Sequence, residues 1–282
     1  MLFCLHSGLG FSQPDKFPAG KFELNIGVRP SAPYSALQNY NADLTAQGSG
    51  PSFSVTVSRH HIIPFNMLRS FYNRVAERGR LRNLSGFLNT YSNNLYLYAS
   101  SNGVDCGRLG NDLVDAGNLG LAQGYGMATA GGSNPALGFD TFEQFYAWLP
   151  GNLFIGPNNR SDDPHEGFET NAAVVVGAAN FDIISRVYRD INLYLANNDD
   201  ALLNSISVNL SRMSNRKSIY NLNPNDWEFV NGQYRLSNSK KSLRELAPSD
   251  NVKTSDECKD FTPTFMSTLS AVLMLHNKKI DI

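Results

Sequence analysis

The stretch SFSVTVSRHHIIPFNMLRSF, residues 52–71, decides the fold that we expect for this chain. Its first seven residues alternate Phe and Val with Ser and Thr, which is the pattern of a strand with one buried face. Pro64 ends that strand, and two adjacent histidines, His60 and His61, stand just before it. The whole chain has five histidines, so a pair at one strand end calls for a chemical explanation.

The second half of the stretch has helical spacing. Its apolar residues recur one and three positions apart and therefore share one face of a helix: Met67, Leu68, Phe71, Tyr72 and Val75. Asn66 can cap the start of this helix, and Gly79 suits its end. The histidine pair is therefore expected between a strand and a helix.

Other segments also carry the pattern of a strand or a helix. We expect strands over 21–28 and 152–157, and a hairpin over 227–236 with its turn at Asn231-Gly232. We expect helices over 83–99, 140–152, about 200–213 and 262–279, and one or two helices over 165–197. The helix over 140–152 begins with the capping-box pattern Asp140-x-x-Glu143.

These elements predict an α+β fold that is mainly helical. Residues 1–50 are expected to form a loop-rich N-terminal extension, and residues 51–199 the core. Residues 200–282 are expected to form a C-terminal helical and hairpin extension packed on that core. Within the core, residues 101–138 are rich in glycine and should form a long irregular insertion.

Composition limits the classes of protein to which the chain can belong. Of its 282 residues, 41% are hydrophobic and 17% charged, which is typical of a globular protein. The net charge of −1 argues mildly against nucleic-acid binding, although residues 59–82 hold six arginines and one acidic residue. The three cysteines are too widely spaced for a disulfide framework or a CxxC metal site, so we expect three unpaired thiols. No apolar run is long enough to span a membrane, and no signal peptide is recognised.

A histidine pair at a strand end can divide two chemical tasks. One imidazole can bind a divalent metal, and the other can act as a general base near neutral pH. The segment PGNLFIGPNNRSDDPHEGFE, residues 150–169, supplies complementary groups. There a strand candidate is followed by a polar turn and then by His165 at an expected helix start. This set suits phosphodiester hydrolysis, which needs a cation and a base that activates water.

The ordered pattern RHHIIP, NLFIGP and His resembles the HNH, or His-Me finger, nuclease family, in the form found in bacterial toxins and secreted effectors. The resemblance covers about residues 52–70 and 150–175. It implies a ββα-metal finger around one divalent ion (Mg²⁺, Mn²⁺, Ni²⁺ or Zn²⁺), with a long insertion between its two strands. It further implies that His60 is a metal ligand, His61 the general base, Asn152 the residue that orients His61, and His165 a metal ligand on the following helix.

Three more residues are candidates because of their chemistry. Arg160 can bind a phosphate through its forked donors, or pair with a neighbouring acid. Asp162 and Asp163 can each bind the metal, or act as turn and N-cap residues. The residue types leave open which of Ser161, Asp162, Asp163 and His165 completes the metal site.

The expected function is that of a metal-dependent nuclease acting as a toxin or effector, on DNA more than on RNA. Its expected partners are nucleic acid and an immunity protein, and we expect no binding to a membrane. We expect production in the cytoplasm, and a non-classical route for any secretion or delivery. Two alternatives stay open: a non-catalytic binding or structural module that keeps an HNH-like scaffold, and a hydrolase of a small phosphate ester.

Overall fold

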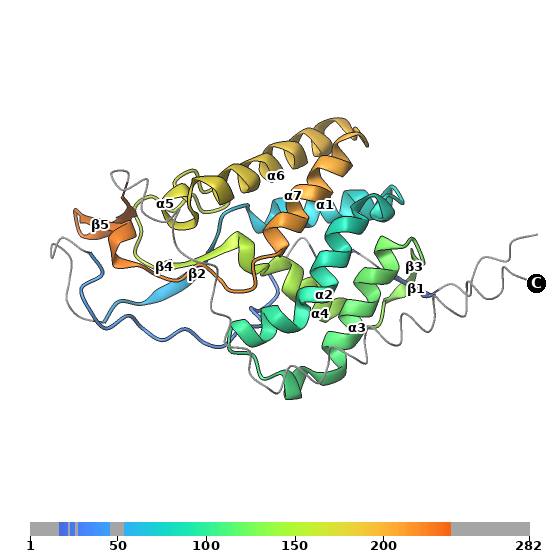
Figure 1. The fold of residues 1–282 in the computed structure, drawn as a ribbon, viewed down its shortest axis with the longest axis horizontal. Coiled ribbons are helices and arrows are strands. Elements are labelled where there is room, and N and C mark those ends of the chain that lie inside the picture. Colours follow the sequence, from blue (N-terminus) through green and yellow to red (C-terminus); the bar gives the residue numbers. More distant parts are fainter. Residues whose placement is uncertain (1–16, 22, 26–27, 46–53, 238–282) are drawn as a thin grey trace, which may run out of the picture.

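The computed structural model describes residues 17–21, 23–25, 28–45 and 54–237. The helix expected over 262–279 lies outside these residues. Within them the chain forms an α+β fold, as predicted, with seven α-helices and three two-stranded sheets. Figure 1 shows the long helices gathered on one side of the molecule, with two of the small sheets at its opposite end.

The strand with the histidine pair is β2 (Val57–His61), which pairs antiparallel with β4 (Leu153–Pro157). His61 lies opposite Leu153, and His60 lies opposite Phe154. The predicted strand over 152–157 is therefore confirmed. On its other edge β4 contacts the segment around Tyr220, which accepts a hydrogen bond from Ile155 N at 2.9 Å. The two predicted halves of the candidate site are thus held side by side by backbone hydrogen bonds.

Helix α1 (Phe65–Glu77) follows β2 and buries the predicted face. Leu68, Phe71, Tyr72 and Val75 are all buried, and Gly79 ends the helix with a φ of +65°. Pro64, rather than Asn66, stands at the N-cap position, and no side chain caps this helix. Proline has no side-chain acceptor, and its backbone carbonyl accepts hydrogen bonds from Met67 N at 3.1 Å and Leu68 N at 3.3 Å.

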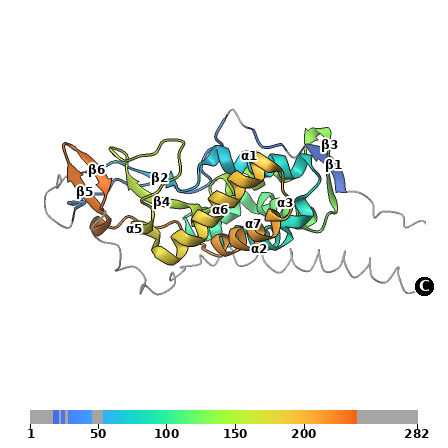
Figure 2. The same cartoon turned by 90° about the horizontal axis from the view of Figure 1, so that it is seen from above.

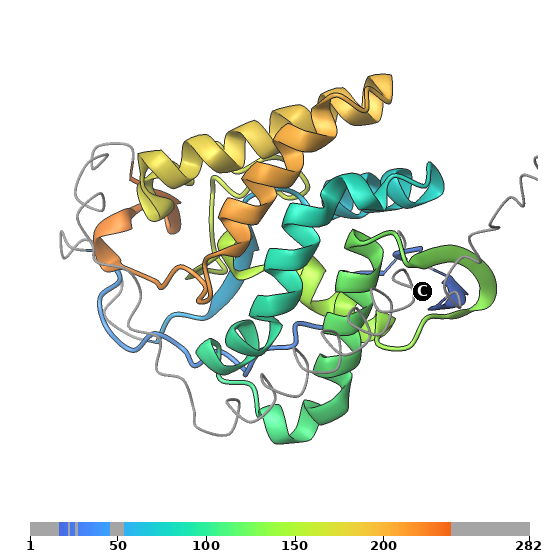
Figure 3. The same cartoon turned by 45° about the vertical axis from the view of Figure 1, so that its right-hand side comes forward.

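The remaining helices form most of the core. Helix α2 (Ser85–Ser101) confirms the helix predicted over 83–99, and α7 (Leu202–Ser214) confirms the one predicted near 200–213. Helix α7 lies beside α6 (Ala178–Asn197), as Figure 3 shows, and also packs against α2. A short helix, α5 (Ala173–Val176), precedes α6, so the span 165–197 holds two helices that begin after its first eight residues.

The expectation of an irregular insertion over 101–138 is wrong. Residues Cys106–Gly124 form helix α3, which is kinked at Gly110, and Ala128–Pro135 form strand β3. Helix α3 packs against α2 through its glycines. A side chain at Gly120 would place its Cβ 2.3 Å from Ser92 Oγ. The glycines therefore allow the two helices to pack closely. Glycine content alone suggests a loop.

The strand at the N-terminal end of the described chain differs from the prediction. Strand β1 (Phe17–Lys21) pairs in parallel with β3, at the end of the molecule far from β2 and β4 (Figure 2). It ends at Lys21, where the predicted strand over 21–28 begins. Cys106, at the start of α3, is disulfide-bonded, so the expectation of three unpaired thiols is also wrong.

Helix α4 (Phe139–Ala147) confirms the helix predicted from residue 140, but its capping box does not form. Gly138 takes the N-cap position with a φ of +78°, and the carboxylate of Glu143 instead accepts a hydrogen bond from Asn25 N at 3.1 Å. Any residue with a Cβ at position 138 would meet the backbone of Asp115. Close packing of α4 against α3 thus decides the helix start.

The C-terminal hairpin matches the prediction. Strands β5 (Trp227–Val230) and β6 (Gln233–Leu236) pair antiparallel, and Asn231 and Gly232 have φ values of +52° and +83°. Such positive angles are what a type I′ turn requires. Over the described ranges, no helix is both long and apolar enough to cross a bilayer.

Candidate functional site

A cavity of about 330 Å³ opens where β2 ends and α1 begins. Five of the seven residues predicted for the site line it: His60, His61, Arg160, Asp163 and His165. The other two, Asn152 and Asp162, lie beside it and make structural contacts that are described below. The two segments predicted from the sequence are therefore brought together around one hollow.

His61 is held by a backbone carbonyl and by aromatic rings. Its Nε2 lies 2.8 Å from the carbonyl oxygen of Ala147, and its ring centroid lies 4.9 Å from that of Trp148. A carbonyl can only accept, so Nε2 carries the proton and Nδ1 keeps a free lone pair. Burial lowers the pKa of His61 to about 4, and Arg29 and His60 add to this effect. The ring is therefore neutral at neutral pH.

His60 lies largely buried between the two strands and the following loop. Its ring stacks on Phe154 with a centroid distance of 5.2 Å. Its Nε2 lies 3.2 Å from the carbonyl oxygen of Pro157 and 3.1 Å from Ser58 Oγ. Its Nδ1 lies 3.3 Å from Asp163 Oδ2. Burial, followed by the charge of Arg160, lowers the pKa of His60 below its usual value.

The contacts of His60 allow two tautomers of the neutral ring. With the proton on Nδ1, the ring donates to Asp163, and Nε2 accepts a hydrogen bond from the Ser58 hydroxyl. With the proton on Nε2, the ring donates to the Pro157 carbonyl, and the lone pair of Nδ1 faces a carboxylate oxygen of Asp163. Two acceptors at 3.3 Å repel each other, so the second tautomer suits a metal cation between them. The lowered pKa of His60 disfavours the doubly protonated ring.

The position of His165 differs from the prediction. It lies in a turn with a φ of +55°, is exposed, and precedes the first residue of α5 by eight positions. Asp163 stabilises the turn, since its Oδ1 accepts a hydrogen bond from His165 N at 2.8 Å. Gly167 N closes the turn on the carbonyl of Pro164 at 2.8 Å. Because proline and glycine favour such a turn over a helix, the expected helix register does not exist here.

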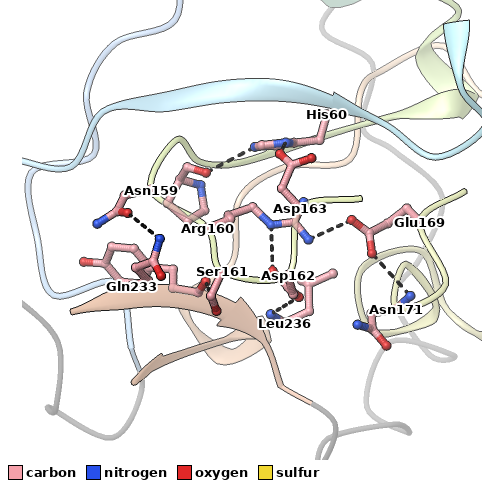
Figure 4. A network of polar contacts seen from close by, with 12 residues as sticks. His60, Asn159, Arg160, Ser161, Asp162, Asp163, Glu169, Asn171, Gln233 and Leu236 are labelled. Atoms are coloured by element: carbon pink, nitrogen blue, oxygen red, sulfur yellow. Dashed lines mark hydrogen bonds and ion pairs between the residues drawn. The ribbon is translucent and has the colours of Figure 1, made fainter. Parts of the chain in front are cut away.

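Arg160 is fully buried as a side chain and pairs with two carboxylates (Figure 4). Its Nε donates to Asp162 Oδ1 at 3.0 Å, and a terminal nitrogen donates to Glu169 Oε2 at 2.7 Å. Burial alone would lower the pKa of Arg160, but Glu169 and Asp162 outweigh it and raise that pKa. Its guanidinium also lies over the rings of Phe154 and Trp227. Arg160 therefore holds the loop to the sheet and borders the cavity.

Asp162 faces away from the cavity, toward the C-terminal hairpin. Its Oδ2 accepts a hydrogen bond from Leu236 N at 2.9 Å (Figure 4). Two further backbone bonds join the same loop to β6: Tyr234 N donates to the Asn159 carbonyl, and Ser161 N to the Tyr234 carbonyl, both at 2.9 Å. The hairpin therefore supports the loop that carries Asp163. Of the two adjacent aspartates, only Asp163 remains available at the cavity.

Asn152 holds the backbone and does not contact the His61 ring. It is completely buried, and its amide makes two hydrogen bonds to Ile63: Ile63 N donates to Oδ1 at 2.8 Å, and Nδ2 donates to the Ile63 carbonyl at 2.9 Å. The expectation that Asn152 orients His61 directly is therefore replaced by two contacts. The Ala147 carbonyl holds the ring, and Asn152 fixes the bend that follows it.

Several residues of the site were not anticipated from the sequence. Arg29, Arg59, Arg69 and Glu169 line the cavity together with the predicted residues. Glu169 is brought there by the hydrogen bond from its N–H to the Ile62 carbonyl at 3.0 Å. The sequence did offer a hint for Arg69, because it lies in a run of arginines after the histidine pair. Nothing in the local sequence marks Arg29, which lies in a loop-like segment.

The other arginines of that run serve the helical part of the fold. Arg74 donates to Asn198 Oδ1 at 2.8 Å, and Arg78 and Arg80 pair with Asp200 in the turn between α6 and α7. Of the arginines in residues 69–82, only Arg69 reaches the cavity. The run is therefore mainly a link between α1 and the α6–α7 pair.

The donors that could hold a divalent metal are His60 Nδ1 and Asp163 Oδ2. Ligand atoms that each lie about 2.0–2.2 Å from one ion are separated by about 3.0–3.5 Å, and these two atoms are 3.3 Å apart. Among the described residues, no group of three or more His, Cys, Asp and Glu side chains is arranged around one point. An ion here would therefore have two protein ligands and would leave positions for water or a substrate oxygen.

Comparison with known proteins adds little about function. No family model matches the chain, and no solved structure matches it. A protein called p9, from Acyrthosiphon pisum secondary endosymbiont phage 1, is 32% identical to this chain over 180 residues. The match covers 59% of this chain and 47% of that protein, so the chain spans about half the length of this relative. The name of p9 states no activity, and the functional conclusion rests on the site itself.

Proposed function

We propose that the chain is a metal-dependent phosphodiesterase, a nuclease of HNH type, with His61 as its general base. The observation that carries this proposal is the arrangement of the adjacent histidines. His61 lines the cavity with its Nε2 held by the Ala147 carbonyl, which leaves Nδ1 as the acceptor of the ring, and His60 Nδ1 lies 3.3 Å from Asp163 Oδ2. One imidazole thus has a nitrogen that can accept a proton, and the other can bind a cation. The pKa of about 4 keeps His61 unprotonated at neutral pH and makes it a weaker base than a free imidazole.

The residues of the chain have distinct tasks in this reaction. The Ala147 carbonyl fixes the tautomer of His61, so that Nδ1 can take a proton from a water molecule that attacks phosphorus in line. The Pro157 carbonyl can accept the Nε2 proton of His60, which leaves the Nδ1 lone pair facing Asp163 for a cation. A divalent cation bound there would stabilise charge on the phosphate and on the leaving oxygen. DNA is the preferred substrate in this proposal, RNA the lesser one.

The finer fold assignment belongs to the same proposal. Strands β2 and β4 and the short helix α5 that follows would form a ββα finger, with α1 to α4 and β3 inserted between the strands. The support is the order of these elements and the position of the histidine pair at the end of β2. The role of a toxin or effector, with an immunity protein as partner, rests only on the resemblance of the sequence pattern.

The test is cleavage of supercoiled plasmid by the full chain with Mg²⁺, Mn²⁺, Ni²⁺ or Zn²⁺. We expect His61→Ala to lower the cleavage rate by about 10²-fold or more, because loss of a general base typically costs that much. A matched control is Arg186→Gln, which changes an exposed side chain on α6 outside the cavity. Undiminished cleavage by His61→Ala, or equal loss in the control, would contradict the assignment.

The alternative is a binding or structural module that keeps this scaffold without catalysis. The absence of a third side-chain ligand among the described residues favours it. It predicts no cleavage with any of these metals and no change in metal content between the wild-type chain and Asp163→Asn. Metal analysis of the two purified proteins therefore distinguishes the alternative from the nuclease proposal.

A further inference from the structure

A segment near the N terminus runs across the site and places an arginine at the cavity. We call residues 28–40 the strap. Pro30 accepts a hydrogen bond from Trp148 Nε1 at 2.8 Å, and Tyr34 donates its hydroxyl to the Trp148 carbonyl at 2.6 Å. Tyr40 pairs with Val55 just before β2. The strap is thus joined to the same tryptophan that packs against His61.

Two arginines that line the cavity bind the strap through its backbone carbonyls. Arg59, on β2, donates to the Ser35 carbonyl, and its guanidinium lies over the Tyr34 ring. Arg69, on α1, donates to the Val28 carbonyl at 3.3 Å and lies over the Phe65 ring at 3.9 Å. The hydrogen bonds of both guanidinium groups go to neutral carbonyl oxygens of the described chain. Within these residues, the carboxylates of Glu143 and Glu166 act on the charge of Arg69 from nearby, without forming an ion pair with it.

Arg29 is the part of the strap that these contacts present to the cavity. Its guanidinium carbon lies 5.7 Å from the ring centroids of both Phe65 and Trp148, the two aromatic residues that also contact His61. Within the described chain it has neither a hydrogen bond nor an ion pair, and its side chain is exposed. Arg29 therefore offers all of its donors next to the candidate base.

The charges at the cavity are separated by segment. The carboxylates Asp163 and Glu166 both lie in the turn after β4, whereas three arginines come from the strap, β2 and α1. The fourth arginine, Arg160, is already offset by Glu169 and Asp162. Asp163, beside His60, can thus take a cation, and Arg29, beside Phe65 and Trp148, can take an anion. Arginine suits phosphate in particular because its forked donors match two oxygens.

We infer that Arg29 and its neighbours Arg59 and Arg69 form a second phosphate subsite, which binds the phosphate next to the scissile one in a nucleic-acid strand. This inference rests on the proposed function and deepens it, since it makes a strand with consecutive phosphates the substrate class. A phosphate ester with a single phosphate cannot occupy the scissile position and the subsite at the same time. The subsite therefore separates a nuclease from a hydrolase of small phosphate esters.

The test is calorimetric titration of the full chain with two probes in EDTA, so that neither metal nor cleavage is needed. The probes are thymidine 3′,5′-bisphosphate and thymidine 5′-monophosphate. We expect the bisphosphate to bind about tenfold more tightly, and Arg29→Gln to remove most of that preference. Arg29→Lys should keep part of the preference, because lysine retains the positive charge but lacks the paired N–H donors of the guanidinium group. Arg186→Gln, on α6, is the control and should keep all of it.

The possible outcomes are distinct from those of the cleavage test. The subsite is rejected if the two probes bind equally or if neither binds. It is also rejected if Arg29→Gln keeps the preference, or if Arg186→Gln loses as much of it as Arg29→Gln does. A clear preference that depends on Arg29, in a chain that cleaves no plasmid, would retain the subsite and reject the nuclease. The two proposals can therefore fail separately.

Discussion

Asn152 is the residue on which the bend after the histidine pair depends. Its two hydrogen bonds to Ile63 are completely buried, so removing the amide leaves an N–H and a carbonyl of the backbone without partners. We expect Asn152→Ala to lower the free energy of unfolding by about 2–4 kcal/mol. Urea denaturation monitored by circular dichroism measures this change.

A suitable control for that experiment is Asn192→Ala on α6, where an exposed amide bonds only to the Tyr188 carbonyl one turn earlier. It should change the stability by less than about 0.5 kcal/mol. An Asn152→Ala protein as stable as this control would show that the buried bonds to Ile63 contribute little.

His61 should make stability depend on pH. Its pKa is about 4 in the folded chain, below the value near 6.5 of an unfolded histidine. Between these values the unfolded chain binds one more proton, so stability falls as the pH falls from about 6.5 to 4, and is fully present above that range. His61→Gln has no titratable group at position 61. Its free energy of unfolding should therefore fall by less over this pH range, and the difference from the wild-type chain should be on the order of 2 kcal/mol. Urea midpoints of both proteins in EDTA at pH 7 and pH 5 measure the difference, and parallel losses would contradict it.

At the residue scale, the sequence predicted which histidines lie at the candidate site, and it did not predict their partners. The adjacent histidines at a strand end suggested a ligand and a base, and both rings do line one cavity. The partner of His61, however, is a backbone carbonyl, and any residue type at position 147 would provide one. Arg29 likewise reaches the site only through tertiary contacts of the strap. Contacts of this kind leave no mark in local sequence patterns.

At the scale of elements, the close contact between α2 and α3 depends on glycine. We expect Gly120→Ala to destabilise the chain by about 1–3 kcal/mol, because the new Cβ would lie 2.3 Å from Ser92 Oγ. Ser92→Ala alone should cost little, since that hydroxyl is buried and has no partner among the described residues. The double variant should recover most of the loss. Thermal unfolding of the wild-type chain and the three variants completes a double-mutant cycle. If the two single changes in stability simply add up in the double variant, the predicted clash is contradicted.

The elements with a clear period were predicted well, and those governed by packing were not. Helix α1, strand β4 and the hairpin with Asn231-Gly232 have patterns that depend only on nearby residues. Helix α3 was missed because its glycines, which favour loops in isolation, are used for contact with α2. The helix expected at His165 was wrong because Pro164 and Gly167 form a turn there.

At the scale of the whole molecule, the site is assembled from segments that are far apart in the sequence. The strap, β2 with α1, and the turn after β4 supply the cavity, while the β5–β6 hairpin holds that turn in place (Figures 1 and 4). The helices between β2 and β4 form much of the core against which both strands lie. The resemblance to the HNH pattern implied that β2 and β4 pair, but the contributions of the strap and the hairpin required the tertiary structure.

The central claim is that one divalent cation binds between His60 and Asp163, beside His61. The most direct measurement is anomalous diffraction from crystals of the full chain grown with Mn²⁺. We predict an anomalous peak about 2.0–2.3 Å from both His60 Nδ1 and Asp163 Oδ2, and no such peak in crystals of Asp163→Asn. A peak elsewhere in the cavity, an unchanged peak in that variant, or no peak at saturating Mn²⁺ would contradict the claim.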